Sequence, residues 1–210
     1  MERREWKLLF LGPPLAGKGT QCRLLSKQLA VPHISSGDLL RKEMEKDTKT
    51  SKYIKSQLSI GALVSDEVIN ELIKKEISEI KGGFILDGYP RTIEQLNMID
   101  FEYDMIILLN TSLEDILDRA SGRLYHPPSG RIYHKKYSPP KVVGLDDVTG
   151  EELQVRDDDK VHIIKRRFMD FIEKTGKVVE KGMEMKKLAV VDGSKGVEEI
   201  NRDILALLGK

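Results

Sequence analysis

The chain has 210 residues, 40% of them hydrophobic and 33% charged, which is typical of a folded globular protein and excludes a disordered or membrane-embedded chain. Lys and Arg number 35 and Asp and Glu 34, so a net charge of +1 gives the whole chain no attraction to nucleic acid or acidic lipid. Any anion site must therefore be local. The length predicts one domain with one or two insertions.

The single cysteine and the first residues indicate the compartment. Cys22 alone can form neither an internal disulfide nor a cysteine-rich zinc cluster, which fits a reducing environment. We expect Cys22 to be a small buried residue on a helix. The start carries Glu2 and Glu5 and leads into an apolar run too short for a secretory core or a membrane span. These features predict a cytoplasmic protein.

Apolar runs of strand length alternate with helical patterns along the chain. The runs are residues 7–11, 32–35, 84–87, 105–109 and 188–191. They are apolar without alternation and are followed by helical patterns, the first of these at residues 17–30. Strands of this kind predict an α/β fold in which helices cover both faces of a parallel sheet.

Polar residues mark the starts of three further helices. Ser35 or Ser36 can cap a helix from Asp38 onward, and Ser65 precedes an apolar stripe over residues 68–77. The segment 111–114, Thr-Ser-Leu-Glu, predicts a capping box for the helix that carries Arg119.

The regular alternation breaks at residues 123–159, where prolines and glycines accumulate among short strand-like pieces such as residues 131–133. A loop of this length inside a compact domain is normally either disordered or functional. Its tyrosines and valines predict a small folded insertion.

The most specific motif lies between the first strand and the first helix. Residues 12–20 read Gly-Pro-Pro-Leu-Ala-Gly-Lys-Gly-Thr. Such a loop directs backbone N–H groups and the positive end of a helix at phosphate oxygens, while Lys18 reaches the outer phosphates. Gly19 replaces the Ser or Thr that usually follows this lysine and coordinates Mg²⁺, and Thr20 comes one position late.

Separated cations need a joint explanation in a nearly neutral chain. They are Lys18, Arg41, Arg91, Arg123, Arg156 and Arg167. Each alone is typical of a surface. Phosphoryl transfer requires preorganised positive charge around several phosphates, so we expect these side chains to converge.

Four blocks in order along the chain resemble those of the adenylate kinase family. They are the loop ending Gly-Lys-Gly-Thr, then residues 34–41 (Ile-Ser-Ser-Gly-Asp-Leu-Leu-Arg), 86–92 (Leu-Asp-Gly-Tyr-Pro-Arg-Thr) with Gln95, and 126–134 (His-Pro-Pro-Ser-Gly-Arg-Ile-Tyr-His). The resemblance covers nearly the whole chain. It implies reversible Mg²⁺-dependent transfer from ATP to AMP, giving two ADP. We expect direct in-line transfer in a closed ternary complex without a phosphoenzyme, because the sequence shows no nucleophilic residue with a base partner.

The resemblance also implies a P-loop core made of residues 1–37, 65–122 and 160–210. A helical segment at residues 38–64 would bind the nucleoside monophosphate, and residues 123–159 would form a small β-rich lid. Both segments would move on closure.

The family implies roles for individual residues. The catalytic residues would be Lys18, Arg91, Arg123, Arg156 and Arg167. The donor would be held by Gly12, Ala16, Gly17, Lys18, Gly19, Thr20, Arg119, Arg123, Lys195 and Val197. AMP would be held by Ser36, Arg41, Leu63, Val64, Gly88, Arg91, Gln95, Arg156 and Arg167. Asp87 and Thr20 would act on Mg²⁺ through water.

Some family lids bind zinc, and the corresponding positions here are His126, Ser129, Asp146 and Thr149. Because Ser and Thr are poor zinc ligands, we expect hydrogen bonds among these four side chains and no structural zinc. The other histidines, residues 33, 134 and 162, lack a spacing that suggests a metal site or a catalytic dyad, and the sequence assigns them no role.

Leu15 departs from the family, which usually has glycine at this position. If the position needs φ > 0 or close approach to phosphate, leucine strains the loop by roughly 1–3 kcal/mol or crowds the nucleotide. Alternatively, the loop tolerates a side chain that points away.

Other functions stay open at this stage. Leu15 motivates a low-activity nucleotide sensor, and GTP is an alternative to ATP because the lid pattern occurs with both donors. The basic run at residues 160–167 suggests nucleic-acid binding, but its acidic neighbours favour a solvated helix face. We expect ATP or GTP and AMP as partners, no nucleic acid, no membrane and a monomer.

Overall fold

The computed structural model describes residues 5–210, apart from the side chain of Asp157. The expectation based on Glu2 lies outside these residues. A five-stranded sheet forms the centre, with the strand order β2-β3-β1-β4-β7, and each neighbouring pair is parallel. The strands are β1 (Lys7–Leu11), β2 (His33–Ser35), β3 (Phe84–Asp87), β4 (Met105–Asn110) and β7 (Leu188–Asp192). The predicted parallel sheet is confirmed.

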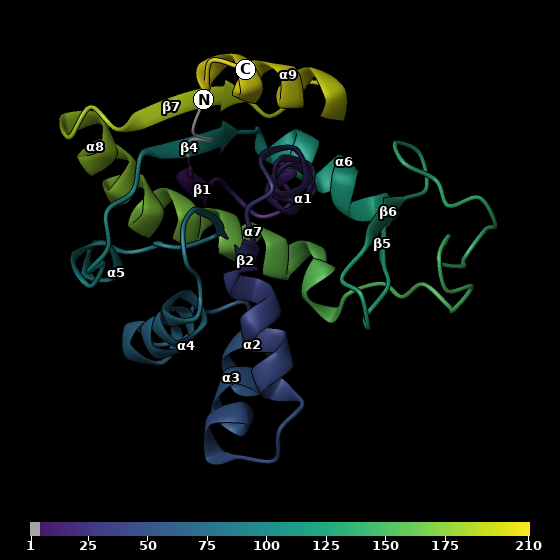
Figure 1. Ribbon diagram of the computed structural model, residues 1–210. Helices are drawn as coiled ribbons and strands as arrows, with labels where there is room; N and C mark the ends of the chain where they lie inside the picture. Colours follow the sequence, from purple (N-terminus) through teal and green to yellow (C-terminus); the bar gives the residue numbers. More distant parts are fainter. Residues whose placement is uncertain (1–4) are drawn as a thin grey trace.

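Helices cover both faces of the sheet (Figure 1). They are α1 (Lys18–Leu29), α4 (Asp66–Ser78), α5 (Ile93–Asn97), α6 (Leu113–Gly122), α7 (Val161–Asp170), the π-helical turn η2 (Phe171–Thr175), α8 (Gly176–Glu184) and α9 (Val197–Leu207). Successive residues of β1 face opposite cores: Leu8 packs with α1 and α9, and Leu9 packs with α4 and α8. Burial on both faces explains why the strand is apolar without alternation.

Two segments project from this core in different directions (Figure 1). One contains α2 (Ser36–Met44) and α3 (Lys49–Ser59). The other is the insertion, in which β5 (Arg123–Tyr125) pairs antiparallel with β6 (Ile132–His134) before the short 3₁₀ helix η1 (Asp157–Asp159). Within residues 5–210, no helix combines the length and the apolar character needed to span a bilayer.

The structure corrects the predicted start of α6. The capping box was placed on Thr111 and Glu114, but Ser112 is the cap, and its hydroxyl accepts a hydrogen bond of 3.1 Å from the Asp115 backbone N–H. Thr111 is buried next to the loop after β7, where a Cβ on Gly193 would lie 2.2 Å from its hydroxyl oxygen. Thr111, which directly follows β4, is therefore buried against this loop, and Ser112 caps the helix. Two other boundaries shift slightly: α2 begins at Ser36, and β6 begins one residue after the predicted piece.

Ser112→Ala should lower the free energy of unfolding by about 1 kcal/mol, the usual cost of losing an N-cap side chain. Urea unfolding measures the difference. The matched control is Glu114→Gln, which should cost at most a few tenths of a kcal/mol because Glu114 loses only its charge near the helix start. If Glu114→Gln lowered the free energy of unfolding more than Ser112→Ala did, the predicted capping box on Thr111 and Glu114 would be supported instead.

Candidate functional site

The predicted site residues lie around the carboxyl ends of the strands. The phosphate loop follows β1, Ser36 follows β2, and Gly88 follows β3. In open parallel sheets, the crevice outside these ends is where ligands bind. The topology thus brings together segments that are far apart in the sequence.

Backbone geometry explains the glycines of the phosphate loop. Gly12 has φ 148°, and a Cβ there would lie 2.7 Å from the carbonyl oxygen of Leu109. Gly17 has φ 93° at the start of α1. Leu15 also has a positive φ, 58°, in the left-handed region that disfavours residues other than glycine. The structure therefore decides between the two sequence alternatives in favour of backbone strain at Leu15.

Lys18 folds back over the loop. Its Nζ donates hydrogen bonds of 2.7 Å to the carbonyl oxygens of Gly12 and Pro13. Burial lowers the pKa of Lys18 to about 8, and the nearby Asp87 carboxylate opposes this shift. Positive groups of Arg91 and Arg167 lower this pKa further. The lysine is a desolvated cation among other cations, and anionic phosphate would stabilise its charge.

One cleft gathers four of the six predicted cations. It is lined by residues of the phosphate loop, α2, α7 and the turn after β3, including Lys18, Arg41, Arg91 and Arg167. Arg156 lies beside them, with its guanidinium carbon 4.6 Å from the centre of the Tyr125 ring. Burial first, and then Arg41 and Arg123, lower the pKa of Arg156. The predicted convergence of positive charge is thus present in the structure.

Acidic residues that the sequence did not single out hold three of the arginines in place. Arg167 Nη1 donates to Asp158 Oδ2 at 2.7 Å, and Arg123 Nε donates to Asp159 Oδ2 at 2.7 Å. Arg41 pairs with Asp38 one turn earlier on α2. These carboxylates fix the guanidinium groups, so little ordering of long side chains remains for ligand binding.

Arg91 is held by groups other than carboxylates. Its Nε donates to the Gly88 carbonyl at 2.7 Å and its Nη2 to the Ser36 hydroxyl at 3.3 Å. A Cβ on Gly88 would lie 3.0 Å from that hydroxyl, so glycine is needed for the close approach. The arginine keeps free donors directed at the cleft.

A smaller pocket adjoins the cleft. It is lined by Ser36, Leu40, Leu58, Ala62, Leu63, Val64, Ile69, Gly88, Arg91 and Gln95. Gln95 is buried, its Oε1 accepts from the Arg91 backbone N–H at 2.7 Å, and its Nε2 donates to Asp66 at 2.7 Å. Each end of the amide retains one further hydrogen-bonding position. An apolar slot ending in such an amide suits a nucleobase.

Three residues predicted for the donor lie at the other side of the phosphate loop. Arg119 Nη2 donates to the Gly193 carbonyl at 2.6 Å and its Nη1 to the Leu15 carbonyl at 3.4 Å. Lys195 pairs with Asp203, and the Val197 carbonyl accepts a hydrogen bond from the Gln21 amide. None of these three residues lines the two pockets, so their roles stay predictions.

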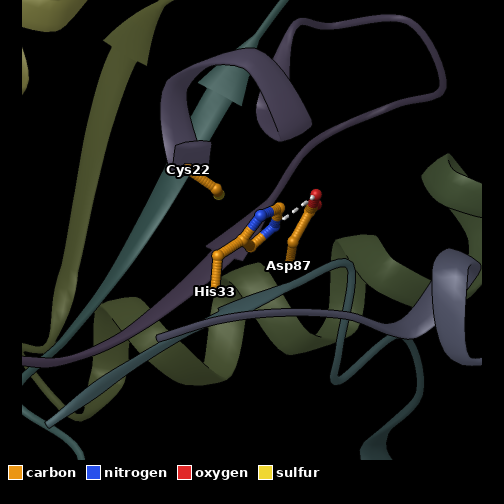
Figure 2. A group of neighbouring side chains, drawn as sticks. All are labelled: Cys22, His33 and Asp87. Carbon is orange, nitrogen blue, oxygen red and sulfur yellow. Dashed lines mark hydrogen bonds and ion pairs between the residues drawn. The ribbon is translucent and has the colours of Figure 1, made fainter. Parts of the chain in front are cut away.

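Asp87 ends β3 beneath the first turn of α1. A Cβ on Gly19 would lie 3.3 Å from its Oδ2, so the missing side chain at position 19 leaves room beside the carboxylate. His33 was given no role from the sequence, yet its Nε2 lies 3.3 Å from the same oxygen (Figure 2). Thr20 lies on the same turn of α1.

The four predicted lid residues lie together. His126 Nδ1 is 2.7 Å from the Ser129 hydroxyl, and the Thr149 hydroxyl donates to Asp146 at 3.1 Å. Asp146 also accepts both arms of Arg131, which hold the pKa of that carboxyl well below its usual range. The lid network therefore includes partners that the sequence missed: Arg131, Tyr133 and Glu151.

Arg23 was also missed from the sequence. It lies on α1 and donates to the Gly130 carbonyl at the lid tip at 3.1 Å. A Cβ on Gly130 would lie 3.9 Å from Asp38 of α2. The lid tip therefore rests against both the core and the helical segment. A cation in the middle of α1 gives no sequence signal for this contact.

The fold and the loop define a P-loop nucleotide-binding protein. A model of the adenylate kinase family matches residues 10–186. A protein named adenylate kinase from Buchnera aphidicola subsp. Cinara cedri (strain Cc) is 40% identical over 207 residues, 95% of each chain. Another of that name, from Francisella philomiragia subsp. philomiragia, is 37% identical over 210 residues, 94% of this chain and 97% of its own.

The chain therefore belongs to the adenylate kinase family, and its class is that of the nucleoside monophosphate kinases. The resemblance inferred from the sequence blocks is confirmed.

Leu15→Gly should raise the free energy of unfolding by roughly 0.5–1 kcal/mol. It relieves a left-handed backbone cost of about 1–2 kcal/mol, and glycine's extra entropy in the unfolded chain offsets part of the gain. Urea unfolding measures it. Leu15→Ala is the matched control, because alanine keeps the Cβ and the strain. Equal gains in both variants would show that side-chain size, not φ, is the problem.

Proposed function

We propose that this protein catalyses reversible transfer of the terminal phosphoryl group of Mg²⁺-bound ATP to AMP, giving two ADP. The observation that carries the proposal is the single cleft in which Lys18, Arg91 and Arg167 meet, continuous in lining with an apolar pocket that ends at Gln95. Arg91 and Gly88 border both cavities. The pocket suits a base and the cleft suits the phosphates, so a mononucleotide would span them.

On the acceptor side, AMP would place its phosphate between Arg41 and Arg91. Leu63 and Val64 would cover the base, and Gln95 would bind its edge. Ser36 and Gly88 would shape the floor, and Arg156 and Arg167 would reach the phosphate as transfer begins. These assignments rest on the lining of the two pockets, except that of Arg156, which rests on its position near Arg41 and Arg123.

On the donor side, backbone N–H groups of the phosphate loop would hold the polyphosphate of ATP. The loop comprises Gly12, Ala16, Gly17, Gly19 and Thr20 besides Lys18. Arg119 would stack on the base, since a planar guanidinium group suits that contact. Lys195 and Val197 would contact the base edge.

Transfer itself would need no covalent intermediate. An AMP phosphate oxygen attacks the γ-phosphorus, the bond from that phosphorus to the β–γ bridging oxygen breaks, and ADP leaves with the electron pair. Lys18 would follow the moving group, and Arg91, Arg123, Arg156 and Arg167 would stabilise charge on its oxygens. Stabilisation of this kind supplies most of the rate in phosphoryl transfer.

The residues present suit a Mg²⁺ ion held through water. Asp87 offers a carboxylate next to the space that Gly19 leaves open, and Thr20 lies on the same helical turn. Mg²⁺ retains several waters in such sites and binds substrate phosphates directly. When bound, it neutralises phosphate charge. Asp87 and Thr20 would orient its waters.

Two segments would move during the cycle: residues 38–64 and the lid at residues 123–159, hinged on a core of residues 1–37, 65–122 and 160–210. In this structure the lid tip contacts Arg23 and approaches Asp38. Enclosure would exclude water, which otherwise competes with AMP for the phosphoryl group. Opening would release the products.

The lid would be held without structural zinc. His126, Ser129, Asp146 and Thr149 already bond with one another, and Arg131 and Tyr133 occupy the Asp146 oxygens. A zinc ion would have to break these bonds to reach two good ligands and two poor ones. We expect the protein to act as a monomer.

Purified protein should convert AMP and ATP to ADP only when Mg²⁺ is present, in a coupled assay. ATP should be the preferred donor, since both relatives are named adenylate kinase, so GTP is not favoured. Leu15→Gly, assayed in parallel, shows whether strain in the loop limits turnover. Nucleotide binding without turnover would instead identify a sensor.

Lys18→Ala should lower kcat by about 100-fold or more, the loss typical of removing one preorganised donor from a transition state. The fold should persist, because the substitution removes a desolvated cation rather than an apolar contact. Circular dichroism and the Tm check this. Lys165→Ala, an exposed lysine on α7, is the control and should keep normal turnover. Near-normal kcat in Lys18→Ala would refute the proposed mechanism.

A further inference from the structure

Three potential metal ligands meet below the phosphate loop, one from each of three core elements. Cys22 comes from α1, His33 from β2 and Asp87 from β3, and their side chains point toward one another (Figure 2). The Cys22 sulfur, a His33 ring nitrogen and an Asp87 carboxylate oxygen all lie within 4.8 Å of one another. The reaction proposed above uses Asp87 but assigns no role to Cys22 or His33.

We propose that Cys22, His33 and Asp87 bind a divalent transition-metal ion of the zinc type, and that the bound ion inhibits phosphoryl transfer. In a tetrahedral zinc site, bonds of 2.0–2.3 Å place ligand atoms about 3.3–3.8 Å apart. The His33 and Asp87 atoms are already 3.3 Å apart. The sulfur lies within 4.8 Å of both atoms, so a shift of at most about 1 Å would complete the set, and water would take the fourth position.

The ligand types favour zinc over magnesium. Thiolate and imidazole suit Zn²⁺, whereas Mg²⁺ demands oxygen ligands in octahedral geometry. Coordination would displace the thiol proton of Cys22 to solvent. It would also replace the hydrogen bond between His33 Nε2 and Asp87, with the neutral ring keeping its proton on Nδ1. One thiolate and one carboxylate would then neutralise the ion. This neutralisation matters because Lys18 and Arg23 place positive charge near Cys22. Without the thiolate, a divalent ion would be neutralised by only one carboxylate, and its remaining positive charge would be repelled by Lys18 and Arg23.

The three side chains are held in a way that favours binding. The parallel register between β2 and β3 pairs Ser35 with Asp87 and His33 with Ile85, so His33 lies two positions from the partner of Asp87 and on the same face of the sheet. Cys22 is fully buried, and the side chains of His33 and Asp87 are each 11% exposed. A small ion thus meets a nearly preformed site, with a narrow opening to solvent at two of its ligands.

Inhibition follows from the shared carboxylate. An ion that engages Asp87 withdraws it from the waters of the Mg²⁺ ion that accompanies the nucleotide. This half of the proposal rests on the proposed function; the binding half does not. The experiment therefore reads binding and turnover separately.

Binding is tested with cobalt(II) and zinc(II) on the whole protein without nucleotide. We expect one Co²⁺ per chain, with a thiolate-to-cobalt charge-transfer band, because Cys22 is the single thiol in the sequence. Cys22→Ala should abolish the band. It should also weaken Zn²⁺ binding by at least about 10- to 100-fold, because loss of a residue that only hydrogen-bonds to a ligand already costs that much and Cys22 is itself a ligand. His33→Gln, which keeps a hydrogen-bond donor toward Asp87, should weaken binding similarly.

The matched control is His126→Gln in the lid, which removes the histidine of the rival cluster. Its band and its Zn²⁺ affinity should equal those of the unaltered protein. Absence of the charge-transfer band in the unaltered protein, or loss of Zn²⁺ binding in His126→Gln with retention in Cys22→Ala, would overturn the proposed site.

Turnover is then measured at fixed free Zn²⁺ with Mg²⁺ in excess. The unaltered protein should lose at least about tenfold in rate at saturating Zn²⁺, whereas Cys22→Ala and His33→Gln should keep basal activity and resist. Equal inhibition of all three would overturn the inhibitory role. If no variant turns over ATP and AMP, the proposed function fails, yet the cobalt band still decides the site.

Discussion

Positive charge crowded at one edge of the sheet is the constraint to which the rest of the structure responds. Lys18, Arg91 and Arg167 lie in one cleft, and desolvation lowers the pKa of each. Taking a charge out of water costs several kcal/mol unless partners compensate. Carbonyl oxygens at Gly12, Pro13 and Gly88 supply part of that compensation. Phosphate oxygens would compensate the remaining cost of burying these charges most effectively, so the cleft favours binding of polyanions.

The carboxylates around the cleft act as fixed partners for the same cations. Asp158 holds Arg167 and Asp159 holds Arg123, so these guanidinium groups are oriented before any ligand arrives. Arg156 differs: among the described side chains its Nε has no hydrogen-bond partner, and its guanidinium rests on Tyr125. Phosphate binding at the held arginines extends an existing ion pair. Phosphate binding at Arg156, as proposed above, would instead satisfy a buried donor, so the bound ligand would favour the closed position of this lid residue.

Local patterns in the sequence predicted the frame because the sheet is buried on both faces. The short apolar runs of β1 and β3, each bounded by glycine, have the length of covered strands, and the loop at Gly12 lies between a predicted strand and a predicted helix. Contacts that depend on strand order were invisible: His33 meets Asp87 across 54 positions of sequence because β2 lies beside β3. Arg23 meets the lid through the packing of the insertion. The positive φ of Leu15 could not be predicted from the sequence, because it is a property of the folded backbone.

Asp87 links the phosphate loop to the cluster of Cys22 and His33, and its surroundings determine which ion it can hold. Lys18 and Arg23 disfavour any cation that arrives without negative charge of its own. A hard ion such as Mg²⁺ arrives bound to the negatively charged nucleotide phosphates, so it would bind near Asp87 together with the substrate. A soft ion gains a thiolate from the protein instead. On the two proposals above, the same carboxylate would therefore select Mg²⁺ when nucleotide is bound and zinc-type ions when the cleft is empty.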